Sequence, residues 1–286
     1  MRIGLTGTTG FVGTALLPFM SSLGHELRTI RHQEETTSLD GLDAIVHLGG
    51  LAHRIGDEAP SPEAFDRANH LYSRALAEQA RNAGIRRFVF VSTINVVAKN
   101  KGILTPDMPV NPLSPYGESK ARAEQAILSV NEIGPVVLRP PLVYGPNAKA
   151  NIASLTRLAL SPWPLPFGLV NNRRSMVGLS NLVEAISFLV TAPQVEGKVF
   201  HVTDAREISL REIVSTIRQS VGMAERLYPV PIWMMQGALN AMGRSHMADQ
   251  LFGDLVVDGS ALNKAGWTPR HDPRHDLAAM ALSFRA

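Results

Sequence analysis

A glycine-rich segment near the N-terminus limits the possible folds of this chain more than any other feature. The apolar run Arg2–Thr6 leads into GTTGFVG at 7–13, and an apolar-periodic stretch follows until Gly24. Glycines at a strand-to-helix turn let the backbone approach a pyrophosphate, and the helix N-terminus supplies amides and a positive dipole. The spacing is GxxGxxG rather than GxGxxG. Its place directly after a strand nevertheless predicts a dinucleotide-binding turn rather than a purely structural one.

Strand-like and helix-like segments alternate through the first half of the chain. We expect strands at 2–6, 25–31, 43–49, 87–92 and 135–139, and helices at 11–23, 61–83 and 115–131. The segment DAIVHLG at 43–49 contains an apolar run typical of strands buried on both faces. The alternation and the short connections predict the α/β class, with a Rossmann-type doubly wound parallel sheet.

The second half of the chain has a different pattern. PWPLP at 162–166 is dense in proline, and the apolar segments after it are shorter and less regular. We therefore expect a dinucleotide-binding Rossmann domain over 1–150. A smaller C-terminal lobe that binds substrate is expected over 151–286, interleaved with the end of the sheet.

Composition excludes several classes of function. The 286 residues include no cysteine, which excludes disulfides and thiolate chemistry and is compatible with a reducing, cytoplasmic location. The formal charge of +3 is too small and too scattered for a nucleic-acid partner, although it suits a small anionic ligand. The nine histidines form no metal-like pair and the carboxylates no close pair suited to hydrolysis, so we expect no metal.

Two apolar segments raise the question of a membrane. The first 20 residues loosely resemble a signal peptide, but four glycines interrupt them and no clean apolar core is present, so we expect folded structure there. The segment Pro229–Gly243 is uncharged but shorter than the roughly 18 apolar residues of a membrane span. A buried or lobe-lining helix is favoured for it over a membrane-surface contact, and no stable membrane insertion is expected.

A tyrosine and a lysine lie four residues apart in SPYGESK at 114–120. Four residues make about one helical turn, so Tyr116 and Lys120 share a face of the helix expected there. Both residue types are common on exposed helix faces. The spacing alone therefore favours an ordinary helix start, and only the surrounding motifs indicate a pair that acts on one proton.

The second strand bears on the choice of dinucleotide. An acidic residue at its end binds a ribose 2′-hydroxyl, whereas a basic one suits a 2′-phosphate. The strand ends in TIRHQ, with no acid before Glu34. Arg31, assisted by His32, therefore favours NADP as the cofactor. NAD is the alternative cofactor, and a solvated strand end is the alternative role of Arg31.

Five motifs occur in the order found in one enzyme family. They are TGTTGFVG at 6–13, DAIVHLGG at 43–50, VST at 91–93, YGESK at 116–120 and LRPPLVYGP at 138–146. Together they resemble an extended short-chain dehydrogenase/reductase of the nucleotide-sugar epimerase/dehydratase group. RRSMVGLSNLVEAI at 173–186 and LNKAGWTP at 262–269 extend the resemblance over nearly the whole chain. The nearest subgroup is bacterial, is related to UDP-glucose 4-epimerase and includes reductases of UDP-4-keto-6-deoxy-N-acetylhexosamines.

The resemblance implies roles for three catalytic residues. Tyr116 would be the general acid/base. A phenol with a pKa of about 10 is a poor base, and Lys120 together with an oxidised nicotinamide would supply the charge that lowers this pKa. Lys120 would also hydrogen-bond the nicotinamide ribose, and Thr93 would hold the reacting oxygen.

The resemblance also implies two sets of binding residues. The cofactor set is Gly7, Thr9, Gly10, Phe11, Val12, Gly13, Arg31, Leu48, Gly49, Gly50, Tyr116, Lys120, Pro140 and Val143. The substrate set is Thr93, Asn95, Asn151 and Arg174. Arg174 aligns with an arginine that contacts the substrate pyrophosphate, a role suited to a forked guanidinium, and Arg244 is a weaker phosphate candidate. For Asn151 a role in a loop turn is nearly as consistent. His47 and His53 would flank the cofactor crevice as structural residues.

Departures from the family pattern narrow the expected reaction. Ile94 and Asn95 follow Thr93 where dehydratases carry an Asp-Glu pair, so dehydration lacks its acid and base. Val-Val-Ala at 96–98 replaces the Val-Tyr-Gly usual in epimerases, and the acidic Gly-Asp turn before the third strand is absent, which leaves the adenine contacts open.

The sequence thus predicts an NADP(H)-dependent oxidoreductase that reduces the C4 keto group of a UDP-linked (6-deoxy) N-acetylhexosamine for surface polysaccharide synthesis. The main alternative is a UDP-sugar 4-epimerase with retained NAD. A non-catalytic dinucleotide sensor is less favoured, because Thr93, Tyr116 and Lys120 are all present. Members of this fold often dimerise through the helices at 61–83 and 115–131, so a homodimer is expected.

Overall fold

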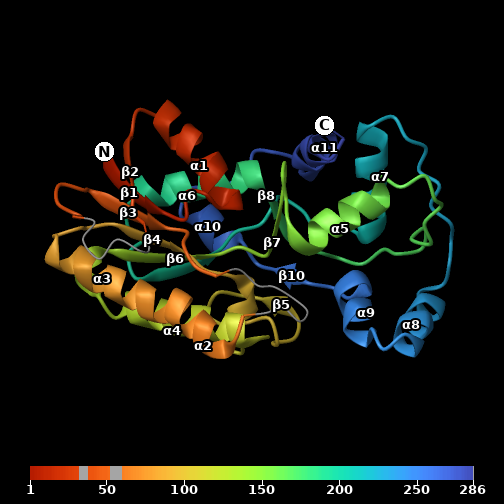
Figure 1. The fold of residues 1–286 in the computed structure, drawn as a ribbon, viewed down its shortest axis with the longest axis horizontal. Helices are drawn as coiled ribbons and strands as arrows, with labels where there is room; N and C mark the ends of the chain where they lie inside the picture. Colours follow the sequence, from red (N-terminus) through yellow and green to blue (C-terminus); the bar gives the residue numbers. More distant parts are fainter. Residues whose placement is uncertain (32–37, 52–59, 286) are drawn as a thin grey trace. The chain divides into compact units, whose positions relative to one another are not determined.

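A computed structural model describes residues 1–31, 38–51 and 60–285 (Figure 1). The described chain divides into two compact units. Unit 1 comprises 1–141, 182–202 and 258–268, and unit 2 comprises 142–181, 203–257 and 269–286.

The sheet of unit 1 has six parallel strands among the described residues, in the order β2-β1-β3-β4-β6-β9. They are β1 (Arg2–Thr6), β2 (Glu26–Thr29), β3 (Ala44–His47), β4 (Phe88–Val91), β6 (Pro135–Arg139) and β9 (Lys198–His201). Every residue of β3, β4 and β6 is buried, as their apolar runs indicate, whereas β2 lies at the edge and is largely exposed. The order reverses between β1 and β3, and the carboxyl ends of strands at such a point form a ligand-binding crevice.

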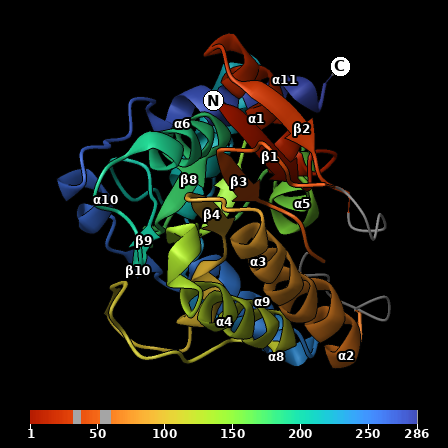
Figure 2. The same cartoon turned by 90° about the vertical axis from the view of Figure 1, so that its left-hand side faces the viewer.

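Helices cover both faces of this sheet, which confirms the predicted Rossmann-type α/β fold. The longer helices of unit 1 are α1 (Phe11–Ser22), α3 (Tyr72–Asn82) and α4 (Pro115–Leu128), and most of α6 (Leu179–Thr191) belongs to it as well. In Figure 2, α3 and α4 lie side by side on one face, with α1 and α6 on the other. Shorter elements are α2 (Pro62–Phe65), η1 (Asp66–Leu71), η2 (Ile94–Val96), β5 (Ile103–Leu104), η3 (Asn131–Ile133) and α10 (Ser260–Lys264).

The helix expected at 61–83 contains an irregularity that its periodicity does not reveal. α2, η1 and α3 follow one another without a break, and η1 is a π-helical turn. Ser61 caps the first turn by accepting a hydrogen bond from the amide of Ala64, and Pro62 occupies the first helical position. A π-turn inserts one extra residue per turn and is frequent at functional sites.

Unit 2 consists of a two-stranded parallel sheet and several helices. The strands are β7 (Leu142–Tyr144) and β8 (Met176–Gly178), which pair with each other, and β10 (Val256–Val257) is a further short strand. The helices are α5 (Ala150–Ala159), α7 (Leu210–Ser220), α8 (Ile232–Ala241), α9 (Ser245–Phe252) and α11 (Pro273–Ser283), and α7 packs against α5 and α11.

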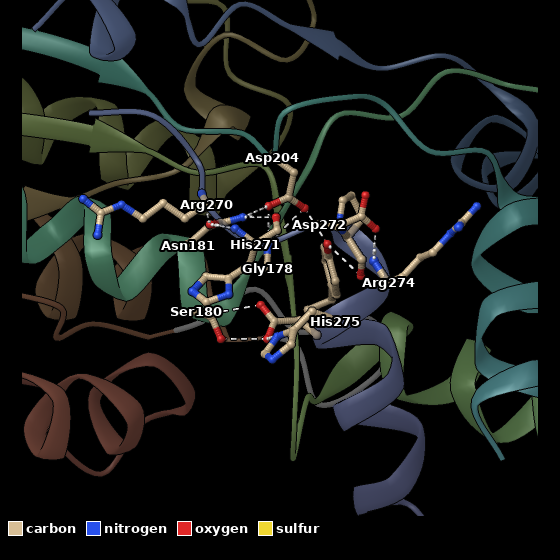
Figure 3. A network of polar contacts seen from close by, with 12 residues as sticks. Gly178, Ser180, Asn181, Asp204, Arg270, His271, Asp272, Arg274 and His275 are labelled. Carbon is tan, nitrogen blue, oxygen red and sulfur yellow. Dashed lines mark hydrogen bonds and ion pairs between the residues drawn. The ribbon is translucent and has the colours of Figure 1, made fainter. Parts of the chain in front are cut away.

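Two buried carboxylates organise the centre of unit 2 (Figure 3). Asp204 accepts hydrogen bonds from the hydroxyl of Tyr144, from the amide of Gly178 at 3.0 Å and from the side chain of Asn181 at 2.7 Å. Asp276 accepts from the amide and hydroxyl of Ser180 at 3.0 and 2.8 Å. Burial raises the pKa of Asp204 above its ordinary value, and these donors offset the cost of burying its charge. The network therefore holds β7, β8 and the start of α11 together.

The segment Pro229–Gly243 corrects one expectation. A buried or lobe-lining helix is expected there, and the segment does form α8, but the burial is not found. Of the residues of α8, all of which are described, only Met235 is buried. Within the described residues no helix is both long and apolar enough to cross a membrane.

Candidate active site

The turn between β1 and α1 is packed too closely for side chains at its glycines. Gly7 has a φ of +69°, and a Cβ there would lie 2.9 Å from the amide nitrogen of Gly49. A Cβ at Gly13 would lie 2.2 Å from the carbonyl oxygen of Gly7. Among the described residues, no side chain caps the first turn of α1 and no acidic residue lies in it. A glycine cradle under an uncapped helix N-terminus fits the pyrophosphate of a dinucleotide.

The other predicted cofactor residues of this turn are exposed or half-buried. Thr9 and Gly10 are exposed, while Phe11 and Val12 at the start of α1 are half-buried. Arg31 follows the end of β2 and is exposed. His32 and His53 lie outside the described residues.

His47 at the end of β3 fixes the loop that faces the glycine turn. Its ring nitrogens lie 2.6 Å from the hydroxyl of Thr6 and 2.8 Å from that of Ser73, and its ring stacks on Phe90. The Thr6 hydroxyl in turn accepts a hydrogen bond from the amide of Gly49 at 2.9 Å. His47 therefore orients the Leu48–Gly50 loop, which matches the structural role expected of it.

Asn69 is a buried polar residue that the motifs do not identify. It lies in the π-helical turn, and its side-chain oxygen accepts from the amide of Leu51 at 2.8 Å. Its amide group donates to the hydroxyl of Ser119, between Tyr116 and Lys120 on α4, at 2.9 Å. Asn69 thus ties the loop after β3 to the helix that carries the tyrosine and lysine. The one sequence signal for it is a polar side chain on the buried face of a helix.

The start of α4 is set by strong helix-initiating residues. The hydroxyl of Ser114 accepts a hydrogen bond from the amide of Gly117, and Pro115 is the first helical residue. A Cβ on Gly117 would lie 2.8 Å from the carbonyl oxygen of Asn95, so the first turn of α4 lies directly against the segment after β4. This contact brings Tyr116 beside Thr93.

The hydroxyl of Tyr116 forms a hydrogen bond with the side chain of Thr93. Burial raises the pKa of Tyr116 to about 12, against the smaller lowering by this hydrogen bond. The Thr93 hydroxyl also accepts from the amide of Asn95 at 3.3 Å, which holds Thr93 at the start of η2. A phenol with this pKa is protonated at neutral pH and can donate its proton.

Lys120 is buried one turn beyond Tyr116. Its ammonium donates to the carbonyl oxygen of Val91 at 2.9 Å and lies 4.1 Å from the centre of the Phe90 ring. Burial lowers the pKa of Lys120 to about 7, while the negative charge of Glu124 acts to raise it. The amine therefore changes protonation state near neutral pH.

Glu124 and Arg139 form a buried ion pair behind this lysine. Arg139 donates to both carboxylate oxygens of Glu124, from Nε at 2.9 Å and from Nη2 at 2.6 Å, and both side chains are 4% exposed. Neither residue was predicted for the site. A signal was present for each, because Glu124 is one helical turn after Lys120 and Arg139 ends a strand that is otherwise apolar.

The remaining predicted residues are divided between the units. In unit 1 the carbonyl oxygen of Pro140 accepts from the amide of Ile94 at 2.9 Å. Val143, Asn151 and Arg174 belong to unit 2. Asn151 is exposed and lies 3.4 Å from the side-chain oxygen of Gln250, while Arg174 is half-buried and donates to the carbonyl oxygen of Gly253 at 3.0 Å. Burial lowers the pKa of Arg174.

The pKa of Lys120 predicts how the stability of the protein without cofactor depends on pH. A lysine whose pKa is about 7 when folded and 10.5 when unfolded contributes stability above pH 10.5 that is lost as the pH falls to 7. The free energy of unfolding of Lys120→Met should therefore lose this rise between pH 7 and 10.5 relative to the parent. Urea unfolding of both proteins across that range measures it. Equal slopes would mean that Lys120 is not buried as described.

The chain is similar in sequence and in fold to known enzymes. The sequence profile of the NAD dependent epimerase/dehydratase family matches residues 3–203. A UDP-glucose 4-epimerase of Vibrio cholerae is 32% identical over 98% of this chain and 94% of its own length. A 4-hydroxy-2-methyl-3-oxo-4-farnesyl-3,4-dihydroquinoline-1-oxide ketoreductase of Stigmatella aurantiaca is 26% identical over 91% and 84%. The structure of MoeE5 in complex with UDP-glucuronic acid and NAD has the same fold, with a TM-score of 0.78 at 23% identity over 100% of this chain and 99% of that one.

Proposed function

Because the chain belongs to the NAD-dependent epimerase/dehydratase family, we propose that it reduces the C4 keto group of a UDP-linked (6-deoxy) N-acetylhexosamine with NADPH. It is an enzyme of the NAD-dependent nucleotide-sugar type, and the proposal concerns its reaction and its coenzyme. The product would serve the synthesis of a surface polysaccharide. The observation that carries the proposal is the Tyr116 hydroxyl hydrogen-bonded to Thr93, one helical turn before the buried Lys120.

Each of these residues has a distinct task in the proposed reaction. Thr93 donates a hydrogen bond to the keto oxygen and orients it toward Tyr116. Tyr116 gives its proton to that oxygen as the C4 carbon is reduced, so that the carbonyl becomes an alcohol and the tyrosine a phenolate. Lys120, when charged, stabilises the phenolate until it is protonated again. When bound, the reduced nicotinamide supplies the hydride.

Reduction and epimerisation begin with Tyr116 in opposite protonation states. An epimerase starts by taking a proton from the sugar hydroxyl, whereas a reductase starts by giving one to a keto oxygen. The phenol holds its proton before cofactor binds, as a phenol of ordinary pKa does at neutral pH, so its protonation is compatible with reduction and does not by itself select it. The two residues after Thr93 are Ile94, which is buried, and Asn95, so no carboxylate for dehydration follows it.

A UDP-sugar 4-epimerase is the second candidate. The name of the Vibrio cholerae relative favours it. In that reaction Tyr116 acts first as a base, and bound NAD with its positive ring would be needed to lower the tyrosine pKa.

Turnover with a panel of UDP-sugars distinguishes the two reactions. We expect stoichiometric oxidation of NADPH with a UDP-4-keto-6-deoxy-N-acetylhexosamine, followed by the absorbance of the reduced nicotinamide, and one C4 alcohol by NMR. Interconversion of two C4 epimers without added cofactor would show that the protein is an epimerase and would overturn the proposal.

Arg31→Asp tests the choice of NADPH. The guanidinium would bind the 2′-phosphate, and hydrogen bonds to charged groups contribute about 1.5–3 kcal/mol, which corresponds to roughly tenfold to hundredfold. The ratio of kcat/KM for NADPH to that for NADH should fall by this factor. Arg211→Asp, the same charge change at an exposed position on α7, is the control. An unchanged ratio in Arg31→Asp would remove Arg31 from the cofactor site.

A further inference from the structure

The exposed side of α8 has an unusual composition for a surface helix. None of its ten residues is charged. Two adjacent rows of residues at one-turn spacing are exposed, Trp233, Gly237 and Ala241 in one and Met234, Ala238 and Met242 in the other, and Asn240 is the exposed polar residue of this helix. Trp233 is 72% exposed and Met242, at the C-cap, is 64% exposed. A helix on the surface of a globular protein ordinarily carries charged or polar residues on this side.

A neighbouring loop of unit 2 extends this apolar surface. Trp163 and Leu169 in the proline-dense loop are 71% and 51% exposed, and Tyr228, just before α8, is 58% exposed. The two segments are hydrogen-bonded to each other, because Leu165 accepts from the amide of Tyr228 and Gly168 donates to its carbonyl oxygen, both at 2.9 Å. They run side by side next to α7 in Figure 1. We call Trp163, Leu169, Tyr228, Trp233, Met234 and Met242 the apolar platform.

A buried arginine holds the backbone of the platform in place. Arg218 on α7 is fully buried and donates to the carbonyl oxygens of Ala159 at 2.8 Å, Trp163 at 2.6 Å and Glu225 at 2.5 Å. A guanidinium has five donors in a rigid fork, and here it joins the loop to the segment that leads into α8. The exposed aromatic side chains therefore project from a fixed backbone.

Within the two sequence segments that carry the platform, all the Asp, Glu, Lys and Arg residues are basic ones. No acidic residue occurs between Glu225 and Asp249, and none between Glu132 and Glu184, the stretch that contains Trp163 and Leu169. Arg226 and Arg244 lie on either side of α8 in sequence, and both are exposed. An apolar surface bordered by cations complements an anionic, partly apolar partner.

We propose that the apolar platform is a membrane-interface site that rests on an anionic lipid bilayer. Trp and Tyr side chains favour the boundary between headgroups and hydrocarbon, and arginines beside them bind lipid phosphates. α8 is half the length of a membrane span of about 20 residues, so it lies in the interface and does not cross it. The proposal does not depend on which sugar the enzyme reduces.

Vesicle co-sedimentation tests this site with the full chain. We expect binding to vesicles of phosphatidylcholine and phosphatidylglycerol in equal parts, weaker binding to phosphatidylcholine alone, and loss of binding at high salt. Tryptophan emission should shift to the blue on binding, because two of the three tryptophans, Trp163 and Trp233, are exposed while Trp267 is buried. The shift should be absent in the Trp163→Phe/Trp233→Phe double variant.

Matched variants distinguish binding through the apolar platform from nonspecific adsorption to vesicles. Trp233→Ser with Met234→Ser should weaken vesicle binding about tenfold or more, because burying an aromatic side chain contributes about 1.5–3 kcal/mol. Arg226→Gln and Arg244→Gln should each weaken it about fivefold on the anionic vesicles only. Ile103→Ser removes a side chain in β5 that is 54% exposed and should change nothing. Thermal melts and turnover in solution should match the parent for all of these variants.

Three results would overturn the proposal. One is the absence of vesicle binding at low salt, and another is an equal loss of binding in Ile103→Ser. The third is a stable dimer in vesicle-free solution that dissociates in Trp233→Ser, since a second copy of the chain would then cover the platform.

Discussion

Replacing Tyr116 by phenylalanine should lower kcat for the proposed carbonyl reduction by about a thousandfold or more, because positioned general acids contribute roughly 10²–10⁴. The change removes one oxygen and keeps the ring, which packs beside Phe65 at 5.8 Å between centroids. The helix start at Ser114 and Pro115 is untouched, so α4 and the position of Lys120 are retained. Steady-state kinetics with the 4-keto sugar and NADPH measures the loss.

Cofactor binding provides the control for this variant. Tyr116 is itself in the predicted cofactor set, but the glycine turn and the loop after β3 do not depend on the phenol oxygen. NADPH fluorescence titration should therefore give a dissociation constant within about tenfold of the parent, the cost of one hydrogen bond. Thr93→Val should lose activity without losing the proton donor, and its rate should fall less than that of Tyr116→Phe. If Tyr116→Phe kept more than a tenth of the parental kcat, the tyrosine would not be the proton donor.

Features written in one continuous segment of sequence are the ones that could be predicted. The glycine turn depends on three glycines at fixed spacing directly after a strand, and the structure shows why a Cβ at Gly7 or Gly13 cannot be accommodated. Tyr116 and Lys120 share a face because one helical turn separates them. The φ of +69° at Gly7, the clash of a Cβ at Gly13 with Gly7 and the shared helix face follow from local backbone geometry, whereas the close approach of Gly7 to Gly49 is a tertiary contact.

Partners that are distant in sequence could not be predicted in the same way. Asn69 matters because a π-helical turn brings it to both Leu51 and Ser119. The hydrophobic periodicity of the sequence does not predict such a turn. The pairing of Glu124 with Arg139 exists only because β6 passes beside α4. Each residue taken alone is an ordinary helix glutamate or strand-end arginine.

Of the two arrangements predicted for α8, buried or lobe-lining, burial was wrong for a different reason. An uncharged helix rich in Met, Leu and Ala has the same composition whether its partner is the protein core or something outside the protein. Composition indicates that the apolar surface of such a helix is covered, but it does not indicate which partner covers it. Trp233, exposed beside Met234, shows that the described chain itself does not cover this face.

Breaking the Glu124–Arg139 pair should cause the largest loss of stability of any single change proposed for this chain. Arg139→Met leaves the carboxylate of Glu124 buried without its two guanidinium donors, and removing one partner of a buried pair costs about 3–5 kcal/mol. Arg206→Met is the matched control, because Arg206 makes the same two-bonded contact with Glu212 at 3.0 and 2.6 Å but both side chains are about a third exposed. A pair of that exposure contributes about 1 kcal/mol or less. Urea unfolding compares the two variants.

The double variant Glu124→Leu/Arg139→Met separates stability from function. Replacing both partners of a buried pair by apolar side chains is close to neutral for stability, so most of the loss in Arg139→Met should be recovered. Lys120 then lacks the negative charge that raises its pKa, and its ammonium should lose its proton at lower pH than in the parent. The alkaline limb of the kcat profile should therefore shift to lower pH although the protein is stable.

A stable double variant with an unshifted profile would assign the pair to folding alone. A double variant as unstable as Arg139→Met would mean that packing around the pair, rather than the orphaned charge, sets the cost.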